Sequence, residues 1–137
     1  MPSEFDRILV AVDGSEHSKR AAETAIGLAE RAHSNLTILT VIDSQTYDRD
    51  PGRANRDAKL VVDEQVKLAK KRGVTVKGDV VSPSDSTIKQ IIDYAKNEGA
   101  DIIVVGSRGL GGFKEMLLGS VSHGITLHAP CSVLIVR

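Results

Sequence analysis

The feature that most constrains this chain is a regular alternation between short apolar runs and longer segments of helical pattern. Residues 7–12 form a short, nearly continuous apolar run, which is typical of a strand covered on both faces. Further strands are predicted over residues 36–42, 74–81, 102–105 and 133–136. Helices are predicted by spacing and by their stop signals over residues 16–33, 56–72, 83–98 and 120–129.

Strands that alternate with helices in this way predict right-handed βαβ crossovers and a parallel sheet with helices on both faces. The predicted fold class is therefore α/β, in a single domain that spans residues 1–137. The polar segment 43–55, which contains Pro51 and Gly52, is predicted to be a loop. The helix 56–72 is expected to turn five apolar side chains toward the core, namely Leu60, Val61, Val62, Val66 and Ala69.

Composition and charge exclude several classes of function. Eighteen Lys and Arg balance eighteen Asp and Glu, so the chain lacks the basic excess that drives non-specific binding to nucleic acid. The single Cys131 excludes an intramolecular disulfide and a Cys-cluster zinc site. No apolar run approaches the ~18 residues that span a bilayer, and the start does not read as a signal peptide. We expect a cytoplasmic protein with no nucleic acid and no membrane as a partner.

The segment after the fourth predicted strand is rich in glycine and serine. Gly106 and Gly109 lack a Cβ where the chain leaves the sheet, which lets the backbone approach a ligand closely. Gly119 and Ser120 then open the last helix, whose first amides lack intrahelical partners and lie at the positive end of the helix dipole. With the hydroxyls of Ser120 and Ser122, these amides form an anion cradle without a basic side chain. The alternative is a set of tight turns with Ser120 as an ordinary N-cap.

A second candidate position is the turn after the first predicted strand, Val12-Asp13-Gly14-Ser15. In open α/β sheets, ligands bind beyond the carboxyl ends of the strands. A carboxylate at that place accepts hydrogen bonds from a base or a ribose, or helps to hold a cation. Alternatively, Asp13 closes an Asx-turn or caps the following helix, and Gly14 eases the bend.

These residues carry a resemblance to a known family. The spacing Gly106-x2-Gly109-x9-Gly119-Ser120 is similar to the nucleotide-binding signature of the universal stress protein family. The opening from Ile8 to Ser15 and the ending from His128 to Arg137 also look like that family, so the resemblance covers essentially the whole chain. It implies a Rossmann-like sheet, similar to that of the adenine-nucleotide α-hydrolases, with strand order 3-2-1-4-5. It also implies an ATP-binding regulatory module of the stress response, with at most slow ATP hydrolysis.

The same resemblance implies a path for the nucleotide, with adenine and ribose near the first two strands and the triphosphate at the last helix. A Mg²⁺ or Mn²⁺ ion would bridge the phosphates, because the neutral chain offers few fixed charges to offset them; its protein ligands stay unassigned. Arg108 flanks the cradle, where it could touch phosphate or be merely solvated, as could Lys114. The expected nucleotide-binding residues are Val12, Asp13, Val41, Gly106, Arg108, Gly109, Gly119, Ser120, Val121 and Ser122.

Two positions depart from the family pattern. Ser132 stands where many members have proline, and Gly124 lies inside the last predicted helix, which costs that helix ~1 kcal/mol relative to Ala. The apolar strand 133–136 would lie at the edge of the sheet, and an exposed edge invites pairing with its copy. As in the family, this predicts a homodimer.

Two other classes of protein fit the sequence less well. An enzyme of the adenine-nucleotide α-hydrolase type, which cleaves ATP, would carry a Ser-Gly-Gly-x-Asp-Ser loop where this chain has Asp13-Gly-Ser-Glu-His-Ser18. A response-regulator receiver would need an acidic cluster after the first strand, an Asp after the third and a Lys after the fifth, and of these only Asp13 fits clearly. The Walker sequence of P-loop nucleotide hydrolases is also missing. We therefore favour an ATP-binding module and keep the α-hydrolase as the alternative.

Overall fold

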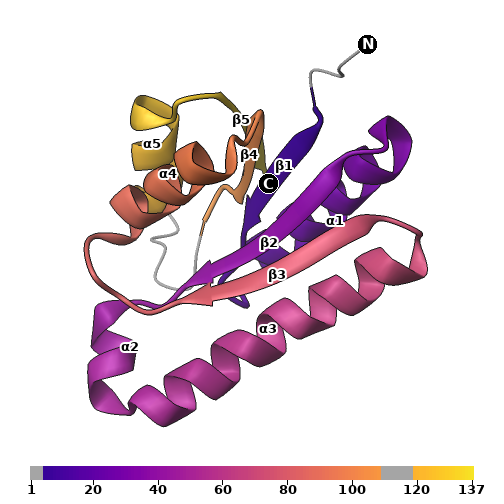
Figure 1. Ribbon diagram of the computed structural model, residues 1–137. Helices are drawn as coiled ribbons and strands as arrows, with labels where there is room; N and C mark the ends of the chain where they lie inside the picture. The colour runs from indigo at the N-terminus through magenta and orange to yellow at the C-terminus, as the bar shows by residue number, and fades with distance from the viewer. Residues whose placement is uncertain (1–4, 109–118) are drawn as a thin grey trace.

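The computed structural model describes residues 5–108 and 119–137. They form one parallel sheet in the order β3-β2-β1-β4-β5, which confirms the predicted fold class and strand order (Figure 1). The predictions for Gly109 and Lys114 fall outside the described residues. The strands are β1 (Arg7–Ala11), β2 (Asn35–Val41), β3 (Thr75–Val81), β4 (Ile102–Gly106) and β5 (Ser132–Val136).

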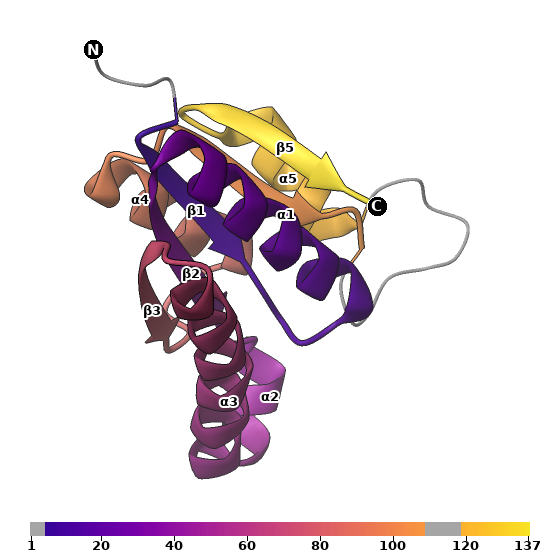
Figure 2. The ribbon, with the colours of Figure 1, turned by 90° about the vertical axis from the view of Figure 1, so that its right-hand side faces the viewer.

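Helices cover both faces of the sheet. α1 (Glu16–Ala32) and α3 (Pro51–Lys71) pack on one face, and α4 (Thr87–Glu98) and α5 (Ser120–His128) pack on the other (Figure 2). Successive residues of a strand point to opposite faces. Accordingly, Val10 belongs to the core beneath α1 and α3, and its neighbour Leu9 belongs to the core beneath α4 and α5. Strand order reverses between β1 and β4, which is where sheets of this kind bind ligands.

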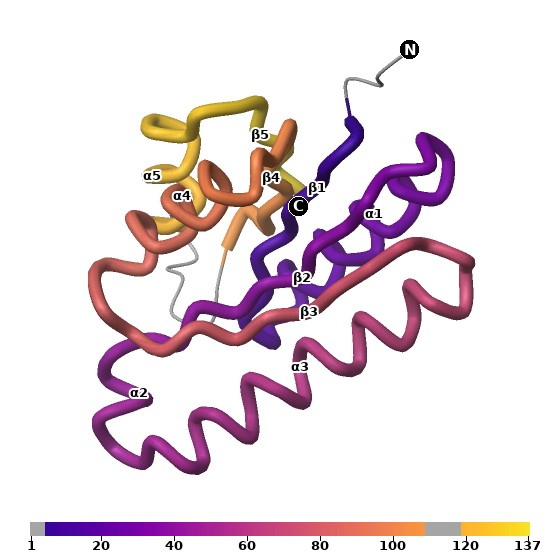
Figure 3. The backbone as a smooth tube through the Cα atoms, in the orientation of Figure 1, coloured from indigo at the N-terminus to yellow at the C-terminus, as the bar shows by residue number. Residues whose placement is uncertain are grey.

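The prediction of a loop over 43–55 is wrong. This segment contains a short helix, α2 (Ser44–Arg49), and the first turn of α3, and Figure 3 traces the chain through both. Asp43 caps α2, and the Asp50 side chain caps α3 by accepting a hydrogen bond from the Arg53 amide at 3.1 Å. Pro51 takes the first helical position, where a missing N–H costs nothing. The Asp-Pro pair therefore starts a helix rather than a turn.

One of the apolar side chains predicted to face the core from α3 does not do so. Val62 and Ala69 are buried and Val61 and Val66 are half-buried, but Leu60 is 68% exposed. Each helical residue turns by about 100°, so three consecutive residues cannot all face a flat sheet. Leu60 lies on the outer side of this turn.

A close contact between α4 and α5 accounts for the glycine inside the last helix. A Cβ at Gly124 would lie 2.4 Å from Cδ1 and 3.0 Å from Cγ1 of Ile88 on α4. Gly124 itself is buried. The helix-propensity cost of this glycine is therefore offset by the close approach of the two helices.

We expect the substitution Gly124→Ala to lower the free energy of unfolding by about 1–2 kcal/mol, because the new methyl group overpacks the α4–α5 contact. Ile88 is β-branched and stiff, so it yields little. In an Ile88→Ala background, the same substitution should instead raise the free energy of unfolding by about 0.5–1 kcal/mol through helix propensity. Urea denaturation of the four proteins measures this change of sign. Destabilisation of equal size in both backgrounds would show that Ile88 is not what requires glycine at 124.

Candidate functional site

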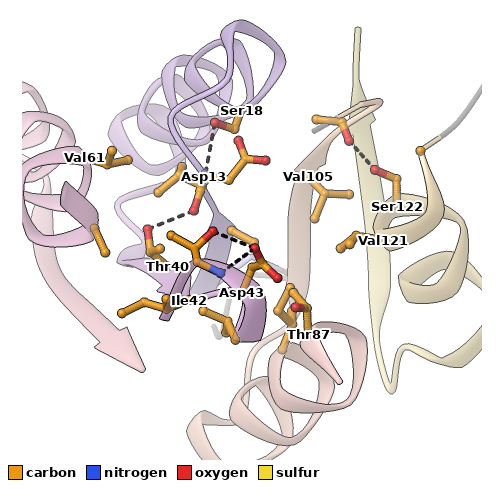
Figure 4. A pocket seen from close by; sticks show the side chains of 18 of the residues that line it. Asp13, Ser18, Thr40, Ile42, Asp43, Val61, Thr87, Val105, Val121 and Ser122 are labelled. Carbon is orange, nitrogen blue, oxygen red and sulfur yellow. Dashed lines mark hydrogen bonds between the residues drawn. The ribbon is translucent and has the colours of Figure 1, made fainter. Parts of the chain in front are cut away.

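A cavity of about 630 Å³ lies at the carboxyl ends of β1, β2 and β4 (Figure 4). This is a usual volume for a small-molecule site. It brings together residues that are far apart in the chain, because the parallel strands all end at the same edge of the sheet. Nine of the ten predicted site residues line it, namely Val12, Asp13, Val41, Gly106, Arg108, Gly119, Ser120, Val121 and Ser122. The tenth is Gly109, which lies outside the described residues.

The start of α5 differs from the starts of the other helices in the described part of the chain. Side-chain oxygens cap α1, α2, α3 and α4, but Gly119 precedes α5 with no side chain to accept a hydrogen bond. Within 5–108 and 119–137, the amides of Ser120, Val121 and Ser122 have no acceptor. These three residues line the cavity. Uncapped amides at the positive end of a helix dipole are suited to an anion.

Gly119 holds this helix start in place. Its φ of −68° and ψ of 163° are the angles of an ordinary N-cap residue, so Ser120 is not the cap. The Gly119 amide donates to the carbonyl oxygen of Ser107 at 2.6 Å, so it is not available to a ligand. The contact ties the start of α5 to the end of β4.

Two predicted site residues serve the packing of the protein. The hydroxyl of Ser122 donates to the carbonyl oxygen of Gly106, so its proton is already engaged. A Cβ on Gly106 would lie 2.7 Å and 2.8 Å from the carbonyl carbon and oxygen of His17. The close approach of α1 therefore requires glycine at 106, whether or not a ligand is bound.

The turn that carries Asp13 is an Asx-turn. Oδ1 of Asp13 accepts from the amide of Ser15 at 2.9 Å, and Gly14 has a φ of +88°, a conformation that side chains rarely adopt. The Asp13 amide in turn donates to Oγ of Ser18 at 3.2 Å. Asp13 thus shapes the turn and also lines the cavity. The Asx-turn is confirmed, and contact with a ligand stays a prediction.

One wall of the cavity was missed in the sequence. α3 and the end of β2 supply an apolar surface to the cavity. The sequence does not predict this surface, because residue Ala54 falls in the segment predicted to be a loop. The sequence analysis also missed polar lining residues such as Asp43. Its position was a usable signal, because Asp43 follows the end of β2 just as Asp13 follows the end of β1. The missed lining residues include Thr40, Ile42, Asp43, Thr46, Ala54, Asp57, Ala58, Val61, Thr87 and Ile91.

Asp43 is an anionic group of this cavity. The hydroxyl of Thr46 donates to it at 2.7 Å and, with smaller contributions from the amides of Gln45 and Thr46, holds the pKa of its carboxyl below the usual value. Partial burial opposes this shift. The carboxylate caps α2, which forms the outer end of the cavity near Thr46.

The lowered pKa predicts how stability depends on pH. Because the folded pKa lies below the unfolded one, the charged cap stabilises the protein above the unfolded pKa, and this contribution is lost as pH falls through the folded pKa. We expect Asp43→Ala to cost about 0.5–2 kcal/mol at neutral pH and progressively less below about pH 4. Thermal unfolding from pH 7 to 3, with Asp48→Ala on the same helix as control, measures this. A cost that stays constant across the range would contradict the prediction.

A divalent ion would have to take most of its ligands from a bound molecule. Within the described ranges, no three His, Cys, Asp or Glu side chains lie close enough together to hold a metal ion. Mg²⁺ commonly binds through substrate phosphates and water, with one or two carboxylates, and Asp13 and Asp43 line this cavity. The donor set therefore fits a phosphate-bridging ion. No helix in the described residues is long and apolar enough to cross a membrane.

Fold and site together define a doubly wound α/β protein with a small-molecule cavity at the topological switch point of its sheet. The sequence profile of the universal stress protein family matches residues 4–137. The chain belongs to the universal stress protein family, as its motifs predicted.

Similar proteins support this assignment. The universal stress protein YxiE of Bacillus subtilis is 32% identical over 149 residues, which cover 97% of this chain and 99% of that protein. A universal stress family protein from Burkholderia pseudomallei has a TM-score of 0.81 at 26% identity, covering 99% of this chain and 98% of the other. A universal stress protein solved in complex with cAMP has a TM-score of 0.78 at 26% identity, covering 98% and 99%.

Proposed function

We propose that this protein binds ATP in the large cavity and acts as a nucleotide-dependent regulatory module. The observation that carries the proposal is the uncapped start of α5, where the amides of Ser120, Val121 and Ser122 open toward a cavity of about 630 Å³. Backbone amides at a helix start are a ready-made phosphate site. Each charge-assisted hydrogen bond contributes about 1.5–3 kcal/mol, so three amides are enough to hold a polyphosphate.

The opposite wall of the cavity suits adenine. Ala54, Ala58 and Val61 on α3, with Val12 and Ile42 at the strand ends, line it with small apolar side chains. Such surfaces accept a flat base, and a few polar groups then orient it. Three carboxylates, those of Asp13, Asp43 and Asp57, line the cavity, and Asp13 and Asp43 are the ones proposed to contact the base or ribose. The family member in complex with cAMP supports an adenine nucleotide as the ligand.

A Mg²⁺ or Mn²⁺ ion is the proposed companion of ATP. When bound, it would neutralise the phosphates and polarise them. The chain's own part is to hold the phosphates at α5 and to keep carboxylates near the base and ribose. ATP hydrolysis is proposed to be slow or absent. The uncapped amides would bind the phosphates equally well in bound ATP and in the transition state, and such uniform binding does not accelerate the reaction.

The proposal is tested first on the protein as purified. The protein is denatured, any released nucleotide is identified by mass, and ATP, ADP and AMP are then titrated calorimetrically with and without magnesium. We expect affinity to fall in the order ATP, ADP, AMP, because the α5 amides contact the terminal phosphates. Equal affinity for all three would contradict that contact. Release of AMP with pyrophosphate from added ATP would favour the α-hydrolase alternative.

We also propose that residues 1–137 act as one cytoplasmic domain that forms a homodimer through β5. β5 lies at the edge of the sheet, and Val133 to Val136 are only half-buried. An apolar edge of this kind pairs readily with its copy. Light scattering at micromolar concentration should give twice the chain mass of 14.7 kDa, and a monomeric mass would refute the dimer.

A further inference from the structure

A second, smaller cavity of about 270 Å³ is lined by His17, Ser107, Arg108 and Arg137. These residues come from the first turn of α1 and from the positions that directly follow β4 and β5, which are paired neighbours in the sheet (Figure 2). Arg108 also lines the large cavity. Two guanidinium groups, an imidazole and a hydroxyl thus border one small space.

Hydrogen bonds hold this arrangement together. Oγ of Ser107 lies 2.9 Å from Nδ1 of His17, which leaves Nε2 as the second hydrogen-bonding atom of the ring. The Ser107 amide donates to the carbonyl oxygen of Val136 at 2.7 Å, and Ser107 is only 3% exposed. Nε of Arg20 donates to the carbonyl oxygen of Arg137 at 2.9 Å. The Ser107 hydroxyl, the His17 ring and the main chain of Arg137 are therefore held at the ends of two strands.

The charged side chains that line the small cavity are those of Arg108 and Arg137. Arg20, one turn along α1 from His17, does not line the cavity, because its guanidinium is engaged by the main-chain oxygen of Arg137. The acidic side chain in the first turn of α1 is Glu16, which lies 3.9 Å from the ammonium group of Lys19 in an exposed pair. Guanidinium groups match the planar spacing of phosphate oxygens and bind them with two hydrogen bonds.

We propose that this second cavity is a phosphate-binding site, distinct from the nucleotide cavity and adjacent to it through Arg108. The ligand is a phosphate oxyanion, either as the free ion or as a small monoester. Arg108 and Arg137 neutralise its charge, and His17 and the hydroxyl of Ser107 add hydrogen bonds. The proposal does not depend on ATP binding, because it rests on the residues of the smaller cavity.

The test follows the imidazole of His17 by NMR while inorganic phosphate is added to the full chain. We expect its ring-proton resonance to shift in a saturable way, whereas sodium chloride of equal ionic strength should not produce that shift. Arg137→Gln should weaken the phosphate affinity by at least about tenfold, as expected for the loss of one charge-assisted hydrogen bond. Arg31→Gln, on the exposed last turn of α1, is the matched control and should leave the affinity unchanged.

Two further titrations separate the small cavity from the nucleotide cavity and identify its ligand. Phosphate is added again in the presence of excess AMP, and the shift at His17 should persist. Suppression by AMP would overturn the proposal, because the small cavity would then be the far end of the nucleotide site. O-phosphoserine, titrated in parallel, distinguishes a free ion from a monoester as the ligand. No saturable shift with either compound, or an unchanged affinity in Arg137→Gln, would also overturn it.

Discussion

The substitution Gly119→Asp is expected to abolish ATP binding while leaving the protein folded and at least as stable. Gly119 already has the backbone angles of an N-cap residue, so aspartate needs no change of backbone conformation there and its carboxylate can accept from the uncapped amides of α5. The free energy of unfolding should stay equal or rise by a few tenths of a kcal/mol, approximately the measured difference between Gly and Asp at such positions. The new carboxylate occupies the place proposed for the phosphates and repels them.

We expect ATP affinity to fall at least about 100-fold, which corresponds to the loss of one or two charge-assisted hydrogen bonds. Gly119→Asn is the matched control, because its side chain caps the helix without the charge and should reduce affinity less. Calorimetric titration gives the affinities, and urea denaturation without nucleotide gives the stabilities. A folded Gly119→Asp protein with unchanged ATP affinity would show that the phosphates do not bind at α5.

The substitution Gly106→Ala is expected to destabilise the protein more than Gly124→Ala does. The new Cβ would meet backbone atoms of His17 at 2.7 Å and 2.8 Å, and a backbone cannot move aside as a side chain can. We expect the free energy of unfolding to fall by about 3 kcal/mol, the upper end of the usual range for overpacking. Urea denaturation without nucleotide measures the effect.

The control for Gly106→Ala is Gly27→Ala in the middle of α1. A Cβ at this position would lie 3.9 Å from the nearest atom, Nη2 of Arg72, which is ordinary contact. Removing a glycine from a helix interior should raise the free energy of unfolding by about 0.5–1 kcal/mol. If Gly106→Ala were as stable as the natural protein, α1 could not be packed against β4 as described.

The fold was predictable because the information for it is local and repeated. Four of the strands read as short apolar segments and β3 as a more polar one, so the order of elements follows from the sequence, although the strand order came from the resemblance to a family. The helical segment 43–55 was missed because Pro51 and Gly52 are typical of turns. Only the capping contacts of Asp43 and Asp50 show that these residues begin helices.

The candidate site was predictable at the ends of β1 and β4 and less so elsewhere. A sequence does not show whether a glycine such as Gly106 is needed for the close approach of a ligand or of a helix. At Gly106 the neighbour is the backbone of His17 in α1. The wall formed by Ala54 and Ala58 depends on how α3 lies across the sheet, which no local pattern specifies. The sequence predicts that the hydroxyl of Ser122 donates to phosphate, but in the structure it donates to the carbonyl oxygen of Gly106.

The most direct test of the phosphate site at α5 is an amide NMR titration of the natural protein. Resonances of Ser120, Val121 and Ser122 are followed while magnesium-ATP is added, and again while adenosine is added. We expect large saturable shifts of these three amides with ATP and little change with adenosine, which should instead affect residues near Val12 and Val41. Equal shifts with adenosine, or none with ATP, would show that the α5 amides do not bind the phosphates.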